Sequence, residues 1–171
     1  MALFFGQPCP LCGVKIRNDD RRFATPHFLG PESDLWRYSD AVMHWDCYAK
    51  REQRPRFAWM YFDAQREWSE RNPFWGIAHS DESLLVTVKP KPVGKVNAML
   101  AATGSHVRVL LRDWENWLGG EWFEGCHHEI EREALAAVLP LLRSKLSSAE
   151  AIVAAAGMNS YTATDGPDRH V

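Results

Sequence analysis

The chain has 171 residues, of which 46% are hydrophobic and 25% are charged, and its formal net charge is −2. This is a globular composition with enough apolar material for a core, and the length fits one ordinary domain or two small ones. The near-neutral charge excludes the chain-wide basic field that drives nucleic-acid binding, although residues 1–56 hold nine basic against seven acidic side chains. The first residues lack the positive flank of a signal peptide, and no apolar run is long enough to span a membrane. We therefore expect a cytoplasmic protein.

Two pairs of potential metal ligands lie in the first third of the chain. Cys9 and Cys12 are separated by two residues, and His44 and Cys47 repeat this spacing after a gap of 31 residues. Three thiolates and one imidazole complete a tetrahedral shell, so the spacing predicts one structural Zn²⁺ bound by all four side chains. Gly13 permits the sharp bend of a zinc knuckle after the first pair. In a reducing cytosol Cys9 and Cys12 also fit a redox dithiol, which would leave the second pair without a role.

The segment between the two pairs contains short extended pieces at 22–24 and 35–38, separated by proline and glycine. These pieces predict a hairpin with a long turn. Ser39 and the two residues after it are typical of a helix start. His44 and Cys47 are three residues apart, so in the first turn of a helix both would face the same ion.

After this region the hydrophobic pattern changes twice. A helix is predicted over 56–71, with a buried stripe formed by Phe57, Met60, Tyr61, Ala64 and Trp68. Four short runs then predict an antiparallel meander, namely 74–79, 84–89, 96–102 and 106–111. The third of these runs also suits a helix.

The last third is predicted to be helical. One helical turn is expected over 113–118, ended by a double glycine, and a longer helix over 128–145, kinked or divided at Pro140. Ser147, with a glutamate three residues later, fits a capping box for a short helix that ends at Gly157. The predicted fold class is α+β.

The predicted organisation has three parts. They are a zinc-binding module at 1–55, an α+β domain of helix, antiparallel sheet and C-terminal helices at 56–157, and a flexible tail at 158–171.

Residues 9–48 as a whole resemble treble-clef zinc fingers, and among them the finger of poly(ADP-ribose) polymerases and related DNA-break sensors. The shared features are the two ligand pairs, an isoleucine after the first pair, an acidic–basic stretch and an aromatic residue after the second pair. In this chain they are Cys9, Cys12, Ile16, Asp19-Asp20-Arg21-Arg22, His44, Cys47 and Tyr48. The resemblance covers about a quarter of the chain and implies a finger used as a structural module.

The function that we expect is non-catalytic binding: the zinc orders the finger, and another surface binds a macromolecule, which we expect to be a protein. An alternative is nucleic-acid binding through the basic face of the finger. The residues of that face are Lys15, Arg17, Arg21, Arg22, Lys50, Arg51 and Arg54. Aspartate and glutamate nearby favour a neutralised solvent face instead, because phosphate binding needs clustered excess charge.

A third hypothesis is a metal-dependent hydrolase or nuclease, since treble-clef scaffolds host nucleases of the His-Asn-His kind. This activity needs a second metal site, for which the candidates are Cys126, His127 and His128, with Glu131 as a partner. Adjacent residues point in different directions, which favours a helix-start loop with a free thiol. The sequence contains no G-x-S-x-G, no phosphate-binding glycine loop and no H-E-x-x-H.

Overall fold

The structure is a computed structural model that describes residues 6–89, 94–121, 123, 126 and 128–158. The predicted tail at 158–171 lies outside these residues except for Met158. Helices and strands are mixed in an α+β arrangement with two antiparallel sheets, as the sequence predicts. The elements are β1 (Arg22–Ala24), η1 (Trp36–Tyr38), β2 (Val42–His44), α1 (Trp45–Ala49), α2 (Arg54–Arg71), β3 (Gly76–Ser80), β4 (Leu84–Lys89), β5 (Lys95–Leu100), β6 (His106–Leu110), η2 (Leu111–Asp113), α3 (Trp114–Asn116), η3 (Trp117–Glu121), α4 (Glu129–Lys145) and α5 (Ala149–Ala155).

The smaller sheet lies in the N-terminal region, which we call the finger (residues 6–50), and corrects one prediction. Strand β1 forms at 22–24 as expected, but its partner is β2 at 42–44 and not the segment 35–38. That segment contains the 3₁₀ helix η1, in which the Tyr38 amide donates to the Leu35 carbonyl at 3.0 Å. Asp40 then adopts a φ of +58°, and this turn leads the chain into β2. The helix expected near Ser39 therefore begins only at α1, after His44.

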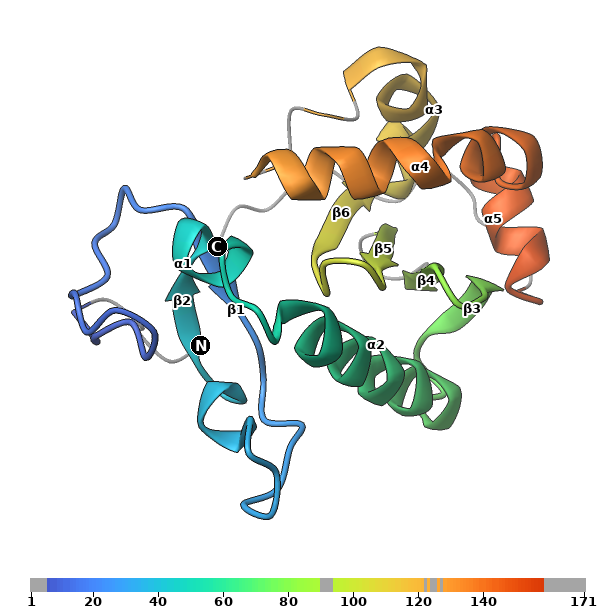
Figure 1. Cartoon of the computed structure of the whole chain (residues 1–171). Coiled ribbons are helices and arrows are strands. Elements are labelled where there is room, and N and C mark those ends of the chain that lie inside the picture. The colour runs from blue at the N-terminus through green and yellow to red at the C-terminus, as the bar shows by residue number, and fades with distance from the viewer. Residues whose placement is uncertain (1–5, 90–93, 122, 124–125, 127, 159–171) are drawn as a thin grey trace.

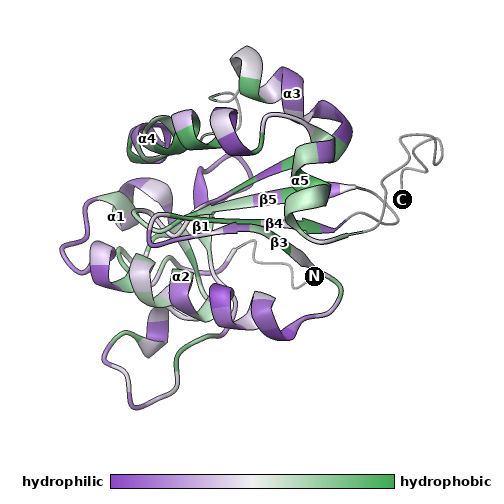
Figure 2. Cartoon of the chain, turned by 90° about the vertical axis from the view of Figure 1, so that its right-hand side faces the viewer, coloured by the Kyte–Doolittle hydropathy of each residue, from purple (hydrophilic) through white to green (hydrophobic). Residues whose placement is uncertain are grey.

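The larger sheet is the antiparallel meander that the sequence predicts, in the order β3-β4-β5-β6. The third run, which also suited a helix, is strand β5. Helix α2 lies on one face of this sheet, and α3 and α4 lie on the other face, so the molecule has three layers (Figure 2). The finger lies beside α2, as the blue and cyan part of Figure 1 shows.

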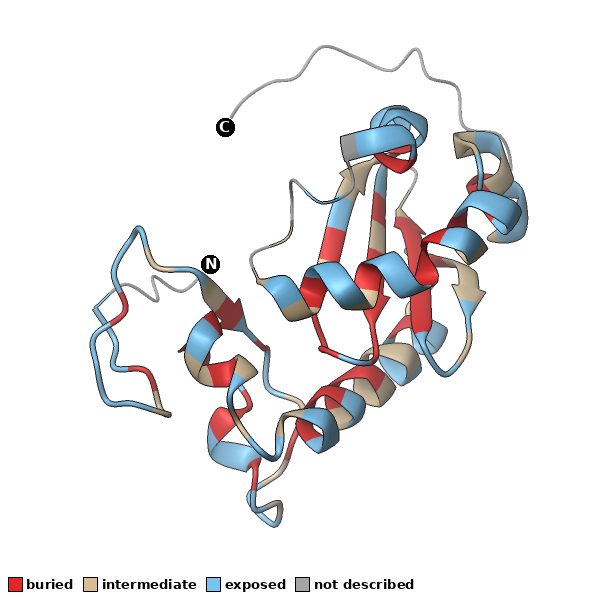
Figure 3. Ribbon diagram, turned by 45° about the horizontal axis from the view of Figure 1, so that its top comes forward, coloured by how far each residue is buried: buried red, intermediate tan, exposed pale blue. Residues whose placement is uncertain are grey.

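The larger sheet separates two hydrophobic cores, because alternate side chains of each strand point to opposite faces. On one face Leu84 and Val86 pack with residues of α4 and α5. On the other face Leu85 and Met99 pack with residues of α2 and of the finger, such as Tyr48. Figure 3 shows the buried positions on the sheet and on the sides of α2 and α4 that face it. The finger thus shares its core with α2 and the sheet.

The C-terminal helices agree with the sequence in position but differ in detail. Helix α4 spans 129–145 and remains one element through Pro140. The helical turn near 113 continues as η3 through the two glycines that were expected to end it. The cap of α5 is Ser148 rather than Ser147, since the Ser148 side chain accepts the Ala151 amide. None of the helices in the described ranges is long and apolar enough to cross a membrane.

Candidate metal centre

The four predicted ligands are placed by a tight turn and by the start of a helix. Cys9 and Cys12 lie in the turn, which the Gly13 amide closes by donating to the Cys9 carbonyl at 2.8 Å. Gly13 has a φ of +75°, a conformation that glycine adopts without steric cost. His44 ends β2 and is the N-cap residue of α1, whose first turn carries Cys47. The expected placement of the second pair at a helix start is confirmed.

The ligand atoms of these side chains converge on one point. The three Sγ atoms and the imidazole nitrogen all lie within 4.8 Å of one another. His44 Nδ1 is 3.4 Å from Cys12 Sγ and 3.9 Å from Cys47 Sγ. In a tetrahedral zinc site, Zn–S and Zn–N bonds of ordinary length place sulfur and nitrogen about 3.6 Å apart. The donor set and its spacing therefore fit one zinc ion, and this is the one such cluster among the residues described.

Asp20 orients the histidine of this site. Its Oδ2 lies 3.2 Å from His44 Nε2, and it also accepts the Arg17 amide at 2.6 Å. The Arg17 amide, followed by His44, lowers the pKa of the Asp20 carboxyl. A carboxylate on the distal nitrogen fixes the ring so that Nδ1 faces the thiols, an arrangement common at metal-binding histidines.

The electrostatics of the thiols also suit a divalent cation. Burial raises the pKa of Cys9, but backbone hydrogen bonds, led by the one from His44, lower it to about 7. Burial raises the pKa of Cys47 to about 12, and the neighbouring Cys12 and Cys9 contribute to the increase. Three thiols so close together cannot all ionise without a compensating positive charge, so metal binding at this site would release protons.

The structure places His128 at the helix start that the sequence predicts. Its Nδ1 accepts the Ile130 amide at 3.3 Å, which makes it the N-cap residue of α4. Its ring stacks on Trp45 with centroids 5.8 Å apart, and its Nε2 is 3.6 Å from the Asp46 carboxylate. His128 therefore links α4 to the finger, as the expected helix-start residue. His127 of the same segment lies outside the described residues.

The seven basic residues predicted to form a basic face fall into two groups by exposure, and two of them, Arg51 and Arg54, lie just beyond the finger. The Arg51 guanidinium lies over the Tyr38 ring, 3.5 Å from its centroid, and burial lowers its pKa. Arg54 is half-buried, and its Nε is enclosed by protein. Arg22 is also half-buried. The exposed members are Lys15, Arg17, Arg21 and Lys50.

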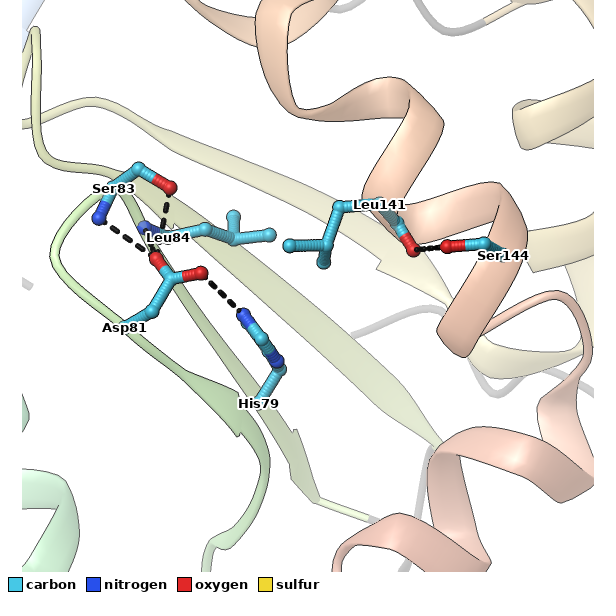
Figure 4. Close-up of polar contacts among 6 residues, drawn as sticks. All are labelled: His79, Asp81, Ser83, Leu84, Leu141 and Ser144. Atoms are coloured by element: carbon cyan, nitrogen blue, oxygen red, sulfur yellow. Dashed lines mark hydrogen bonds and ion pairs between the residues drawn. The ribbon is translucent and has the colours of Figure 1, made fainter.

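A second polar group stands at the turn between β3 and β4 (Figure 4). Asp81 Oδ1 accepts the Ser83 amide, the Ser83 hydroxyl and the Leu84 amide, and Asp81 Oδ2 lies 2.8 Å from His79 Nε2. A nucleophilic serine would instead donate to the histidine. Because Ser83 and His79 both bond to the aspartate, the arrangement is that of a turn held closed by one carboxylate.

The sequence did not predict two features of the structure. Asp20 meets His44 only because β1 and β2 pair, and its separation of 24 residues from the histidine carries no signal. Tyr61, Asn97 and His106 form a hydrogen-bonded chain drawn from α2, β5 and β6. No short motif marks that chain.

Comparison of the sequence and the structure with protein-family models, with curated proteins and with solved structures finds no match.

Proposed function

We propose that this chain is a non-catalytic binding protein whose finger is a treble clef ordered by one structural Zn²⁺, in a module at 1–55 similar to the poly(ADP-ribose) polymerase-type finger. The observation that carries the proposal is the complete donor set of Cys9, Cys12, His44 and Cys47 around one point. Four protein ligands fill a tetrahedral shell and leave no coordination position for a substrate, which is typical of structural zinc.

The interior of the finger supports a structural role for the metal. The finger has few regular elements, and three of its buried side chains form an aromatic cluster: Phe23 stacks on Tyr48 with centroids 3.8 Å apart, and Trp45 lies edge-on to both rings. Trp45 and Tyr48 flank Cys47 on α1. Structural zinc contributes on the order of 10–16 kcal/mol, against a typical net domain stability of roughly 5–15 kcal/mol. The metal would therefore decide whether this cluster forms.

The partner that we propose is an extended segment of another protein, bound in a groove between the finger and the larger sheet. This groove has a volume of about 770 Å³ and is lined along its length by β1 and β6. Both strands stand at the edges of their sheets. An exposed strand edge accepts a further strand through main-chain hydrogen bonds.

The hydrogen bonding of β6 supports this mode of binding. At its two ends, the Leu100 amide donates to the Ser105 carbonyl and the Leu111 amide donates to the Gly94 carbonyl. Bonded and non-bonded pairs alternate in an antiparallel ladder, so the backbone groups of His106, Arg108 and Leu110 point away from β5. These three residues offer the amides and carbonyls to which a peptide strand would bind.

The test of the zinc proposal is elemental analysis of the purified chain combined with two serine variants. We expect one zinc per chain, and we expect Cys12→Ser to lose both the metal and the near-ultraviolet circular dichroism of the finger aromatics. Cys126→Ser is the matched control, because Cys126 lies outside the cluster, and it should retain both. A metal-free native chain, or a Cys12→Ser variant that folds as the parent does, would contradict the proposal.

The test of the partner uses selection of linear peptides from a displayed library against the zinc-loaded full chain. We expect the selected peptides to slow hydrogen exchange at His106, Arg108 and Leu110. Protection confined to another surface would contradict the groove. Binding to DNA or heparin that collapses between low and moderate salt would instead indicate nucleic-acid binding through Lys15, Arg17 and the other exposed cations.

A further inference from the structure

A cavity of about 440 Å³ lies between α2 and the face of the larger sheet that this helix covers. Tyr61 and Trp68 of α2 form one wall, and Asn97 of β5 and His106 of β6 belong to the opposite one. The volume is within the range of small-molecule sites in proteins. The cavity is separate from the metal centre, whose ligands do not line it, and most of its lining residues do not line the groove between β1 and β6.

A fixed chain of polar groups lines one side of the cavity. His106 Nδ1 lies 3.2 Å from Asn97 Oδ1, and His106 Nε2 lies 2.9 Å from the Tyr61 hydroxyl. The amide oxygen can only accept, so Nδ1 carries the proton and Nε2 accepts from Tyr61. Burial, together with the Arg108 charge, lowers the pKa of His106 to about 3, so the imidazole is neutral. The Asn97 amide hydrogens and the Tyr61 hydroxyl lone pairs remain available to a polar ligand edge.

Two indole rings form the aromatic part of the lining. Trp68 and Trp75 have ring centroids 6.5 Å apart and an interplanar angle of 59°. Trp68 belongs to the helix stripe that the sequence predicts to be buried, yet 49% of it is exposed. An indole held half in solvent beside a cavity offers a face on which a planar ring can stack.

The charge of the lining has one sign. The charged side chains among the described lining residues are Lys95 and Arg108, and none of these residues is an aspartate or a glutamate. Both cations are exposed, one at the start of β5 and one in β6. Such a pair attracts an anionic group, since Arg and Lys are the usual partners of carboxylates and phosphates. His106 is neutral and adds no further charge to the lining.

We propose that this cavity binds a small planar aromatic ligand that carries a carboxylate or a phosphate. The ring stacks on Trp68, with Trp75 beside it, its polar edge meets Asn97 and Tyr61, and the anionic group lies against Lys95 and Arg108. This site goes beyond the proposed protein-binding function, and it would exist whether or not the groove binds a peptide.

The experiment titrates the zinc-loaded full chain with two matched pairs of probes, followed by calorimetry and by tryptophan fluorescence. Indole-3-acetate and indole-3-acetamide test the carboxylate, and adenosine 5′-monophosphate and adenosine test the phosphate. We expect at least one anion to bind at submillimolar concentration, and its neutral partner to bind about tenfold more weakly. The anion that binds identifies which of the two groups the site takes.

Variants locate the site. Trp68→Ala and Lys95→Gln should each weaken binding of the anion by about tenfold, because each removes one recognition element from the lining. Trp36→Ala and Lys145→Gln are the matched controls, an exposed indole of η1 and an exposed lysine of α4, and should bind as the parent does. The proposal is overturned if neither anion binds at millimolar concentration, if the neutral partners bind equally well, or if the control variants lose as much affinity as the cavity variants. Thermal unfolding of each variant establishes that it is folded.

Discussion

The substitution Asp20→Asn separates the orientation of the metal-binding histidine from the ligands themselves. The Asp20 carboxylate accepts from His44 Nε2 at 3.2 Å and from the Arg17 amide at 2.6 Å. Asparagine has nearly the same shape and keeps one acceptor oxygen, but it removes the negative charge. The four proposed zinc ligands are untouched, so any change in zinc affinity reports on what the carboxylate does through His44.

The expected loss follows from the exposure of this contact. Removing the hydrogen-bond partner of a metal-binding histidine typically costs about 10–100-fold in metal affinity. The Asp20 side chain is 28% exposed, so water replaces part of the lost interaction, and the asparagine oxygen replaces another part. We therefore expect the lower end of the range, a loss of about tenfold.

The measurement is competition for zinc between the full chain and a chromophoric chelator of known affinity at fixed pH and salt. Asp19→Asn is the control, because Asp19 is the neighbouring exposed aspartate and its substitution changes the net charge equally. It should leave zinc affinity within about twofold of the parent. Equal losses in the two variants would mean that zinc affinity depends only on the negative charge of the loop, and the orienting role of Asp20 would be refuted.

Three further substitutions test the packing of the chain, each by its free energy of unfolding in denaturant. Tyr48→Phe removes the hydrogen bond that a buried hydroxyl donates to the Thr103 carbonyl at 2.7 Å. It should cost about 1–3 kcal/mol, because the carbonyl is left unpaired. An unchanged denaturation midpoint would contradict this expectation. Although burial raises the pKa of Asp81, hydrogen bonds, led by the one from His79, hold it well below its ordinary range. The pKa of Asp81 is therefore lower in the folded than in the unfolded chain. The ionised carboxyl stabilises the fold above about pH 4, and this contribution is lost as the pH falls further. Asp81→Asn should abolish that part of the pH dependence of the free energy of unfolding. Gly104→Ala places a side chain at a φ of +67° and should cost about 1–2 kcal/mol, whereas a neutral result would show that the turn relaxes.

The metal centre could be predicted because its geometry is encoded locally. The two residues between Cys9 and Cys12 set the width of a tight turn, and the same spacing between His44 and Cys47 sets one turn of helix. Only one long-range event, the pairing of β1 with β2, was needed to complete the site. Local spacing thus identified all four residues of the cluster, although the partner strand was assigned to the wrong segment.

Asp20 could not be predicted, because its role depends on that long-range pairing. The segment 35–38 has the strongly apolar and aromatic composition of a strand, whereas Val42 to His44 is shorter and borders the ligands. Both segments are compatible with an extended backbone, and the choice between them was made by bonds such as that of the Thr25 amide to the Ala41 carbonyl. The contact of Asp20 with His44 follows from this register and from no local pattern.

Helix α2 shows how a periodic pattern can give the right element and the right face but misjudge burial at the end of the stripe. The predicted stripe ran to Trp68, but the buried residues toward the C-terminal end of the helix are Phe62 and Ser69. Trp68 instead lines the cavity between α2 and the sheet. Periodicity indicates which residues share a side of a helix, but it does not indicate how far the neighbouring sheet extends beneath them.

The shared core leads to a last prediction, that zinc and the aromatic anion bind cooperatively. Phe28 of the finger packs on Tyr61 with ring centroids 4.9 Å apart, and Pro26 of the finger lines the cavity. Removing zinc releases the segment that carries both residues, so the anion should bind the zinc-free chain more weakly. Linkage requires that the anion raise zinc affinity by the same factor, and chelator competition with and without the anion measures it. Equal anion affinity with and without zinc would show that the cavity forms without the finger.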